Sequence, residues 1–355
     1  MSGGGERNPG ISICIITGRR LAQLDACLAS LQRQVDPPSF ELLVCSDGDE
    51  HVAATVHRRF PAARVCFVER ALPGAGRNLL VVEARGDLLL FLDDDVTVDE
   101  DLLGRLDRLA ATHPEAGVFG GPNDSALDST RFQFVQGAVL ASIVGSGPVR
   151  RRYGAHPARY ADERFFVLCN LAVRREVMVP FSHELVCAEE NALLGEMSRR
   201  GVKMFYDPSL VAYHERRPTL RGFAQQMHKY GFGRGQLGVR EPATVRPSYL
   251  APAALLAHVV TLPLAVLAVG PVAMVPLAAY GAAVVAAAAR IALTLRRPFD
   301  AALAGLLVVV LHVAYGLGVI RGTVARRRPV EHPVVLRWHD DRGAEGVVTA
   351  ASIDL

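Results

Sequence analysis

One segment of the sequence limits the possible folds more than any other. Residues 249–289 contain no charged side chain, and this segment is about twice as long as the ~20 residues that one membrane crossing requires. So long an uncharged stretch is rare in soluble folds. Gly270-Pro271 lies near its middle and predicts a tight turn between two helices. A third apolar run, Ala301–Ile320, follows a short charged loop.

We therefore expect a membrane region at 241–322, with helices at about 250–269, 272–290 and 301–320, and then a tail at 323–355. The charges before and after the third run favour different topologies. After two crossings Arg296 and Arg297 face the cytosol, which is the side where loops of membrane proteins carry more Lys and Arg. A third crossing leaves the tail outside, although further arginines follow at 321 and 326–328. The run either crosses against these charges, or it is re-entrant or lies at the interface. Its length favours crossing.

The first part of the chain predicts an α/β domain at 11–240, after a flexible N-terminus at 1–10. Short apolar runs alternate with helix-length polar segments, which indicates a parallel sheet covered on both faces. Expected strands are 11–17, 40–46, 63–69, 87–93, 167–173, 203–206 and 210–213. Expected helices are 21–34, 130–144, 188–200 and 220–230, the last followed by a linker. Ligands of such sheets bind beyond the C-terminal ends of the strands.

Composition excludes some classes of function. The N-terminus is polar and glycine-rich and does not have the pattern of a signal peptide, so we expect a cytosolic α/β domain. A net charge of +3 with 6% aromatic residues is not typical of a nucleic-acid-binding surface. The six cysteines form no C-x-x-C pair, which favours buried, reduced thiols.

Three adjacent carboxylates follow the strand at 87–93. Asp93 and Asp95 lie on one side of an extended chain and could share a divalent ion, whereas Asp94 points away. Without a cation the three charges repel one another. The alternative is a solvated acidic turn before the next helix.

Glu189 and Glu190 open the helix expected at 188–200. Two acidic residues in the first turn can simply stabilise the helix through its dipole. Alternatively, one of them can act as a general base. Gly74–Asn78 forms a helix start with Arg77, which suits a diphosphate or an ordinary turn. His214 follows a strand and either ligates a metal or packs in the core.

Together these motifs resemble family 2 glycosyltransferases, which have the GT-A fold. The motifs stand in the family's order over residues 11–235: Thr17, Asp47-Gly48, Gly76-Arg77-Asn78, Leu92-Asp93-Asp94-Asp95, Glu189-Glu190, Pro208 and His214. The sequence departs from the family at Ile16-Thr17-Gly18-Arg19, where Pro-Thr-Tyr-Asn is usual. It also has Glu190 where the family has an aspartate base, so either glutamate could serve.

The resemblance implies a Rossmann-like nucleotide-sugar-binding sheet and an inverting sugar transfer. The nucleotide-diphosphate sugar donor would contact Thr17, Asp47, Arg77, Asp93 and Asp94. Mn²⁺ or Mg²⁺ would bind Asp93, Asp95 and His214. Glu190, or Glu189, would be the base.

The apolar helices and the segments Gly120–Asn123 and Phe223–Arg234 are similar to those of succinoglycan-type exopolysaccharide glycosyltransferases. This similarity implies a multi-pass protein of the plasma (inner) membrane, in contact with membrane lipids and with a lipid-linked or glycan acceptor. Processive relatives carry Gln-x-x-Arg-Trp before the membrane. The only tryptophan is Trp338, so we expect the addition of a single sugar. The alternatives are an inactive nucleotide-sugar-binding scaffold and a metal-dependent nucleotidyltransferase.

Overall fold

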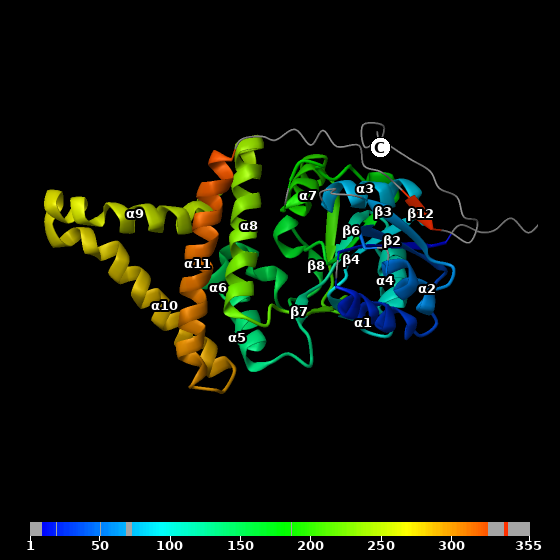
Figure 1. Ribbon diagram of the computed structural model, residues 1–355, viewed down its shortest axis with the longest axis horizontal. Coiled ribbons are helices and arrows are strands. Elements are labelled where there is room, and N and C mark those ends of the chain that lie inside the picture. The colour runs from blue at the N-terminus through cyan, green and yellow to red at the C-terminus, as the bar shows by residue number, and fades with distance from the viewer. Residues whose placement is uncertain are drawn as a thin grey trace, which may run out of the picture.

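The computed structural model describes residues 9–18, 20–49, 51–68, 73–185, 187–325 and 337–339. An α/β domain and a set of long helices lie side by side, and a helical hairpin projects away from both (Figure 1).

The α/β domain is built on one large sheet. Its strand order is β12-β3-β2-β1-β4-β9-β6-β10-β8. The strands β1 (Ile11–Thr17), β2 (Phe40–Asp47), β3 (Arg64–Val68) and β4 (Leu88–Asp93) are parallel to one another. These four strands confirm the expectation from the apolar runs, with ends that differ by one residue at most.

Beyond β4 the sheet is mixed, so the expectation of a parallel sheet was wrong for this half. β9 (Asn170–Arg174) runs antiparallel between β4 and β6 (Ala116–Gly120). A parallel neighbour needs a crossover connection, whereas β9 is reached through a loop-rich segment. The edge strands β8 (Arg159–Tyr160) and β12 (Arg337–His339) are also antiparallel to their neighbours, which are β10 (Lys203–Tyr206) and β3.

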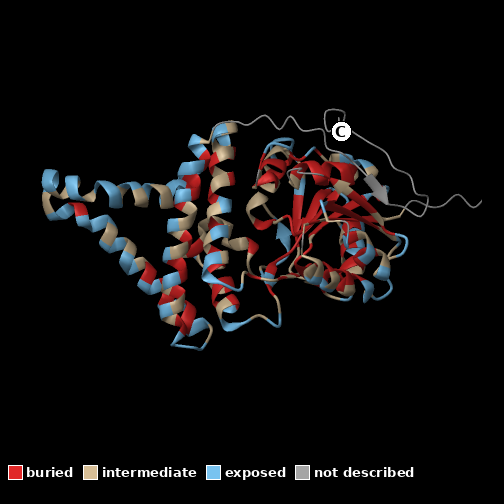
Figure 2. Cartoon of the chain, viewed as in Figure 1, coloured by how far each residue is buried: buried red, intermediate tan, exposed pale blue. Residues whose placement is uncertain are grey.

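Helices cover both faces of the sheet, and the strands are buried almost throughout (Figure 2). Ile11, Ile13 and Ile15 pack on one face, against α1 (Leu21–Gln32), α2 (His51–Arg59) and α4 (Leu102–Thr112). Cys14 and Cys45 lie on the other face, with α3 (Pro73–Glu83) and α7 (Glu189–Arg199). All six cysteines are free and five are buried, as expected, with Cys187 partly exposed.

A second sheet of three strands forms beside the first. β11 (Ala212–His214) lies between β5 (Val96–Val98) and β7 (Asn123–Ser125). The expected strand at 210–213 therefore exists, although it begins two residues later and does not join the large sheet. In its register His214 pairs with Val96, which brings the histidine next to the carboxylates that follow β4.

Two connected helices and a longer one adjoin the α/β domain. α5 (Arg131–Leu140) begins with a capping box between Thr130 and Gln133, and α6 (Ile143–Ser146) follows it. α8 spans Leu220–Arg240, ten residues beyond its expected end. Its glycines resemble a linker in the sequence, but they let α8 pack closely on a neighbouring helix, and such tertiary contacts override helix propensity.

The apolar region forms three helices. α9 (Pro247–Val269) and α10 (Val275–Thr294) make the projecting hairpin, which turns at Gly270 with φ of 75°. α11 (Asp300–Val324) instead lies along α8 (Figure 1).

Two segments of the described chain, Pro247–Thr294 and Asp300–Val324, are long and apolar enough to cross a membrane. The pair formed by Arg131–Leu140 and Ile143–Arg152, bent by 66°, would qualify only if both parts made one span. The most apolar part of the hairpin segment is fully unburied, whereas half of that part of α11 is buried within the protein.

Candidate active site

A cavity of about 1510 Å³ opens at the C-terminal ends of β1, β2 and β4. All of the residues that the sequence predicts for the site line it: Thr17, Asp47, Arg77, Asp93, Asp94, Asp95, Glu189, Glu190 and His214. They come from six separate parts of the chain. The fold therefore brings the predicted acidic cluster, the predicted base helix and the predicted donor contacts into one space.

The acidic cluster and His214 form a compact group. Asp93, Asp95 and His214 each offer a ligand atom, and these three atoms lie within 4.8 Å of one another. The pairing of β11 with β5 accounts for this arrangement, since the Glu215 amide donates to the Asp95 carbonyl at 2.9 Å. His214 Nε2 lies 3.2 Å from a carboxylate oxygen of Asp95.

This group fits a divalent cation. Carboxylate oxygens are preferred by Mg²⁺ and Mn²⁺, and an imidazole nitrogen suits transition metals. Asp95 Oδ1, which lies 3.2 Å from His214 Nε2, is buried and has no hydrogen-bond partner among the described residues, so it retains the capacity to bind a cation. Asp93 is less buried than its two neighbours and faces the cavity.

Asp94 is not one of the three residues whose ligand atoms lie together, and it is not solvated. Its side chain is fully buried and accepts a hydrogen bond of 2.7 Å from the Thr17 hydroxyl. Burial raises the pKa of the Asp94 carboxyl to about 6. Thr17 thus connects the end of β1 to the end of β4.

Substitution of Thr17 should show how much this link stabilises the protein. Thr17→Val removes the donor and leaves a buried carboxylate oxygen unsatisfied, which should lower the free energy of unfolding by about 1–3 kcal/mol. Thr17→Ser, which keeps the hydroxyl, is the matched control. Thermal unfolding of the purified protein should show a lower midpoint for valine alone. Equal midpoints for valine and serine would mean that the hydrogen bond does not contribute.

Arg20 neutralises the acidic cluster, and the sequence analysis missed it. Its guanidinium lies 2.5 Å from Asp94 and also pairs with Asp95. Burial opposes ionisation of Asp95, but His214, Arg20 and Arg217 together hold the pKa of that carboxyl below its usual value. The only signal in the sequence was a basic residue shortly after the first strand.

Arg77 joins the metal group to the helix of the two glutamates. It donates to Glu189 at 2.7 Å and to Asp93 at 3.2 Å. Burial raises the pKa of Glu189, although Arg77 opposes this shift. Glu189 is therefore held in a buried ion pair, and Arg77 contacts two carboxylates at once.

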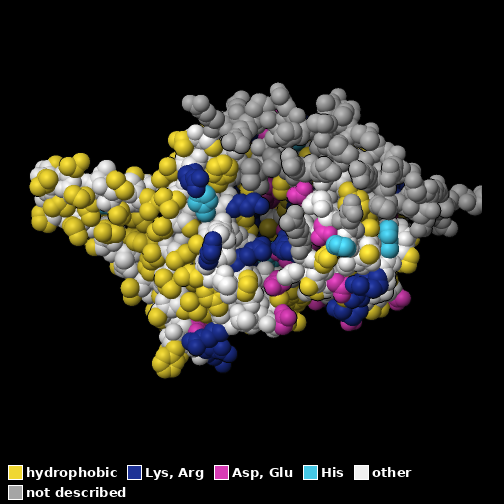
Figure 3. All heavy atoms as spheres, in the orientation of Figure 1, with side chains coloured by type: hydrophobic (Ala, Val, Ile, Leu, Met, Phe, Trp, Pro, Cys, Tyr) yellow, Lys and Arg dark blue, Asp and Glu magenta, His cyan; other side chains and the backbone are white. Residues whose placement is uncertain are grey.

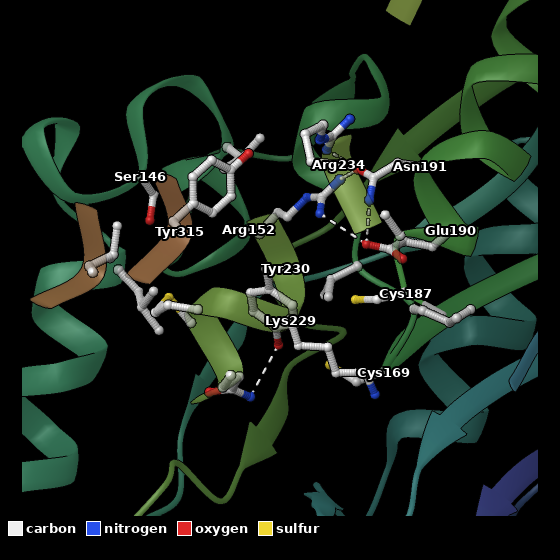
Figure 4. A pocket seen from close by; sticks show the side chains of 18 of the residues that line it. Ser146, Arg152, Cys169, Cys187, Glu190, Asn191, Lys229, Tyr230, Arg234 and Tyr315 are labelled. Atoms are coloured by element: carbon white, nitrogen blue, oxygen red, sulfur yellow. Dashed lines mark hydrogen bonds and ion pairs between the residues drawn. The ribbon is translucent and has the colours of Figure 1, made fainter. Parts of the chain in front are cut away.

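Glu190 has a different environment. Its carboxylate accepts a hydrogen bond from the Asn191 amide at 2.7 Å and lies 3.4 Å from Arg152 (Figure 4). Its side chain is 16% exposed, against 8% for Glu189. Ala188 precedes the pair in the left-handed region, with φ of 70°, where non-glycine residues are uncommon. Both glutamates have an arginine partner, but the arginine of Glu190 lies farther away, at 3.4 Å against 2.7 Å for Glu189.

Comparison with known proteins agrees with this geometry. Residues 12–179 match the profile described as Glycosyl transferase family 2. The structure is similar to that of a mannosyltransferase from Pyrobaculum calidifontis in complex with GDP-Man and Mn²⁺, with a TM-score of 0.55 and 17% identity over 90% of this chain and 88% of that chain. TarS 1–349 of S. aureus gives a TM-score of 0.44 and 15% identity over 63% of this chain and 64% of that chain. A search of curated proteins gives no match.

Proposed function

We propose that this protein, whose residues 12–179 match the profile of family 2 glycosyltransferases, transfers one sugar with inversion from a nucleotide-diphosphate sugar to an acceptor hydroxyl at the cell membrane. One observation carries the proposal. The possible metal ligands and Glu190 line the same cavity, and Arg77 bonds both to Asp93 of the metal group and to Glu189, the neighbour of Glu190. The site thus offers one acidic group for a metal-bound diphosphate and a second carboxylate for a proton.

Asp93, Asp95 and His214 would hold Mn²⁺ or Mg²⁺, which would neutralise the charge of the leaving diphosphate. Glu190 accepts the proton of the acceptor hydroxyl while the oxygen of that hydroxyl forms a bond to the anomeric carbon. The bond from that carbon to the diphosphate oxygen breaks, and the electron pair leaves with the nucleoside diphosphate. Thr17 and Asp47, at the ends of β1 and β2, line the donor side of the cavity.

A thermal-shift screen of the detergent-solubilised protein tests this proposal. A ligand that binds only the folded state raises the unfolding midpoint. We expect a nucleoside diphosphate to do so with Mn²⁺ and to lose its effect in a chelator. No shift with any nucleoside diphosphate, or a shift with nucleoside triphosphates only, would contradict a sugar-nucleotide donor and favour a nucleotidyltransferase.

We further propose that α9 and α10 cross the membrane and that α11 lies along its cytosolic surface. The first support is β12, which pairs with β3 in the sheet of the catalytic domain. This pairing places residues 337–339 on the same side as that domain. A third crossing would place them on the opposite side. In this proposal an in-plane helix takes the place of the span expected at 301–320, and the charges at 321 and 326–328 no longer conflict with the topology. Residues 326–328 lie outside the described part of the chain.

The packing of α11 on α8 supports the same topology. The two helices run in the same direction with their backbones in contact: a Cβ atom on Gly231 would lie 2.1 Å from the Tyr315 carbonyl oxygen, and one on Gly322 would lie 2.1 Å from that of Phe232. α8 extends Lys229 and Arg234 into the catalytic cavity. If α11 crossed the bilayer, α8 and its charges would have to enter it too, at high cost.

The free side of α11 is suited to a lipid surface. Its exposed residues up to Ile320 recur every three or four positions and are apolar: Ala302, Leu306, Val309, Val313, Leu317 and Ile320. At the C-terminal end of the helix Arg321 and Thr323 are also exposed, beside Val324. A helix with one apolar face can lie in the interface plane. The hairpin helices, with 23 and 20 residues, are each about as long as the ~30 Å hydrocarbon core is thick.

Cysteine labelling in intact cells distinguishes the two topologies. In a variant that lacks the six native cysteines, Val272→Cys at the hairpin tip should react with a membrane-impermeant maleimide. Thr323→Cys, at the end of α11, should react only after lysis. Ala351→Cys, at a position outside the described residues, should also react only after lysis. Labelling of Thr323→Cys in intact cells would contradict the in-plane helix, and protection of Val272→Cys would contradict a crossing hairpin.

A further inference from the structure

We propose that the cavity beyond Glu190 binds the phosphate head of a membrane lipid on Arg152, Lys229 and Arg234, with the lipid chain between the hairpin and α11. The inference rests on the proposed function, because this lipid would be the carrier of the acceptor sugar. This lipid site adjoins the proposed site of the nucleotide-sugar donor but uses none of the residues assigned to the donor or the metal.

Two guanidinium groups meet on a single neutral oxygen. Asn191 Oδ1 accepts a hydrogen bond of 2.9 Å from Arg152 and one of 2.8 Å from Arg234 (Figure 4). Arg152 is 7% exposed, and its buried Nε has no hydrogen-bond partner among the described residues. Like charges this close repel one another unless an anion lies between them. A phosphate group would accept hydrogen bonds from both guanidinium groups.

The surrounding charge is positive. Lys229 also lines the cavity, and neither Lys229 nor Arg234 forms an ion pair within the described part of the chain. Glu190, 3.4 Å from Arg152, is the acidic side chain paired with this group. On the face shown in Figure 3, Lys and Arg side chains gather where the long helices meet the α/β domain. Three cations with one carboxylate leave an excess that an anionic ligand would balance.

Beyond these cations most of the cavity lining is apolar, although His258, Tyr280 and His312 also belong to it. Past Tyr315 it continues among α6, α9, α10 and α11, where it is lined by Ile143, Leu255, Pro276 and Leu311. These are the helices that we place in or on the membrane. One continuous space therefore runs from the metal group, past the cations, to a part of the protein in contact with lipid.

This continuity identifies the class of ligand. A free phosphate would use only the cations, and an uncharged lipid would use only the apolar part. A lipid phosphate uses both, and its membrane location raises its local concentration at the site. With the phosphate on Arg152 and Arg234, a sugar attached to it would lie beside Glu190, where its hydroxyl loses the proton.

Equilibrium binding of radiolabelled farnesyl phosphate to the purified full-length protein tests the proposal. Measurements in a chelator keep phosphate groups from the metal site. We expect unlabelled farnesyl phosphate to compete at least about 10-fold more strongly than farnesol or inorganic phosphate. Equal competition by inorganic phosphate would indicate a site for free phosphate, and equal competition by farnesol would indicate a purely apolar site. Either result would overturn the proposal.

Variants locate the site. Lys229→Gln with Arg234→Gln should weaken farnesyl phosphate at least about 10-fold, whereas Arg221→Gln, on an exposed part of α8, should not. Ala254→Phe fills the apolar part and should weaken binding, whereas Ala257→Phe on the same helix, outside the cavity lining, should not.

Nucleoside diphosphate binding with Mn²⁺ is measured in parallel, and in all these variants it should match the wild type. This also shows that they are folded. If the wild type binds nucleoside diphosphate but not farnesyl phosphate, the lipid site fails and the proposed function stands. If the Lys229→Gln and Arg234→Gln variant loses nucleoside diphosphate and keeps farnesyl phosphate, the cations belong to the donor.

Discussion

Asp95→Ala is expected to abolish sugar transfer and to remove Mn²⁺-dependent nucleotide binding. Asp95 is the member of the metal group that His214, Arg20 and Arg217 all approach. Its loss removes one of three possible metal ligands. It also removes the carboxylate that His214, Arg20 and Arg217 contact. The rate should fall by at least about 10²–10³-fold, the scale of a lost electrostatic stabiliser. Transfer rate and nucleotide affinity, each with and without Mn²⁺, are the measurements.

Asp94→Asn is the matched control. Asparagine keeps an acceptor for the Thr17 hydroxyl, and Asp94 is not among the residues of the metal group. We expect a milder loss than at Asp95. Equal losses at positions 93, 94 and 95, or full activity in a chelator, would refute the assignment of Asp93 and Asp95 as the carboxylate ligands.

Glu190→Gln is expected to keep donor binding and to lower turnover by about 10²-fold or more, the usual scale for a lost general base. Glutamine preserves the size and one hydrogen-bonding oxygen, so Asn191 and Arg152 retain a partner. Turnover and donor affinity measured separately distinguish a base from a binding residue.

Glu189→Gln should affect turnover less, because Glu189 is held by Arg77 in a buried ion pair. Its main effect should be on stability, since Arg77 loses a charged partner. The opposite ranking of the two variants would move the base to Glu189. Wild-type turnover in both variants would mean that neither glutamate is the base and that the two residues only stabilise the start of the helix.

The sequence predicted those parts of the fold that depend on local pattern. Four apolar runs specify β1 to β4, and the polar residues at the ends of β1, β2 and β4 line the cavity. The same reasoning cannot find β9 running antiparallel, because strand direction depends on a connection that has no pattern of its own. It also ended α8 at residue 230, since glycines that permit helix contact are identical in sequence to those of a linker.

The site was predictable where its residues follow strands or open helices, and it was not where they meet only in three dimensions. Arg20, which follows β1, contacts carboxylates that follow the neighbouring strand β4. Arg152, Asn191 and Arg234 come from three distant segments and share no spacing. The contacts of α11 with α8 and the pairing of β12 with β3, on which the proposed in-plane position of α11 rests, also depend on tertiary structure and have no pattern in the sequence.

The products of a nucleotide-sugar reaction test the central claim most directly. The purified protein, incubated with the donor found by thermal shift, Mn²⁺ and membranes that supply the acceptor, should release nucleoside diphosphate and transfer the sugar to the lipid fraction. Both products should disappear in a chelator and fall about 10²-fold or more with Glu190→Gln. Release of pyrophosphate, or transfer that persists in the chelator and in Glu190→Gln, would contradict a metal-dependent glycosyltransferase with Glu190 as its base.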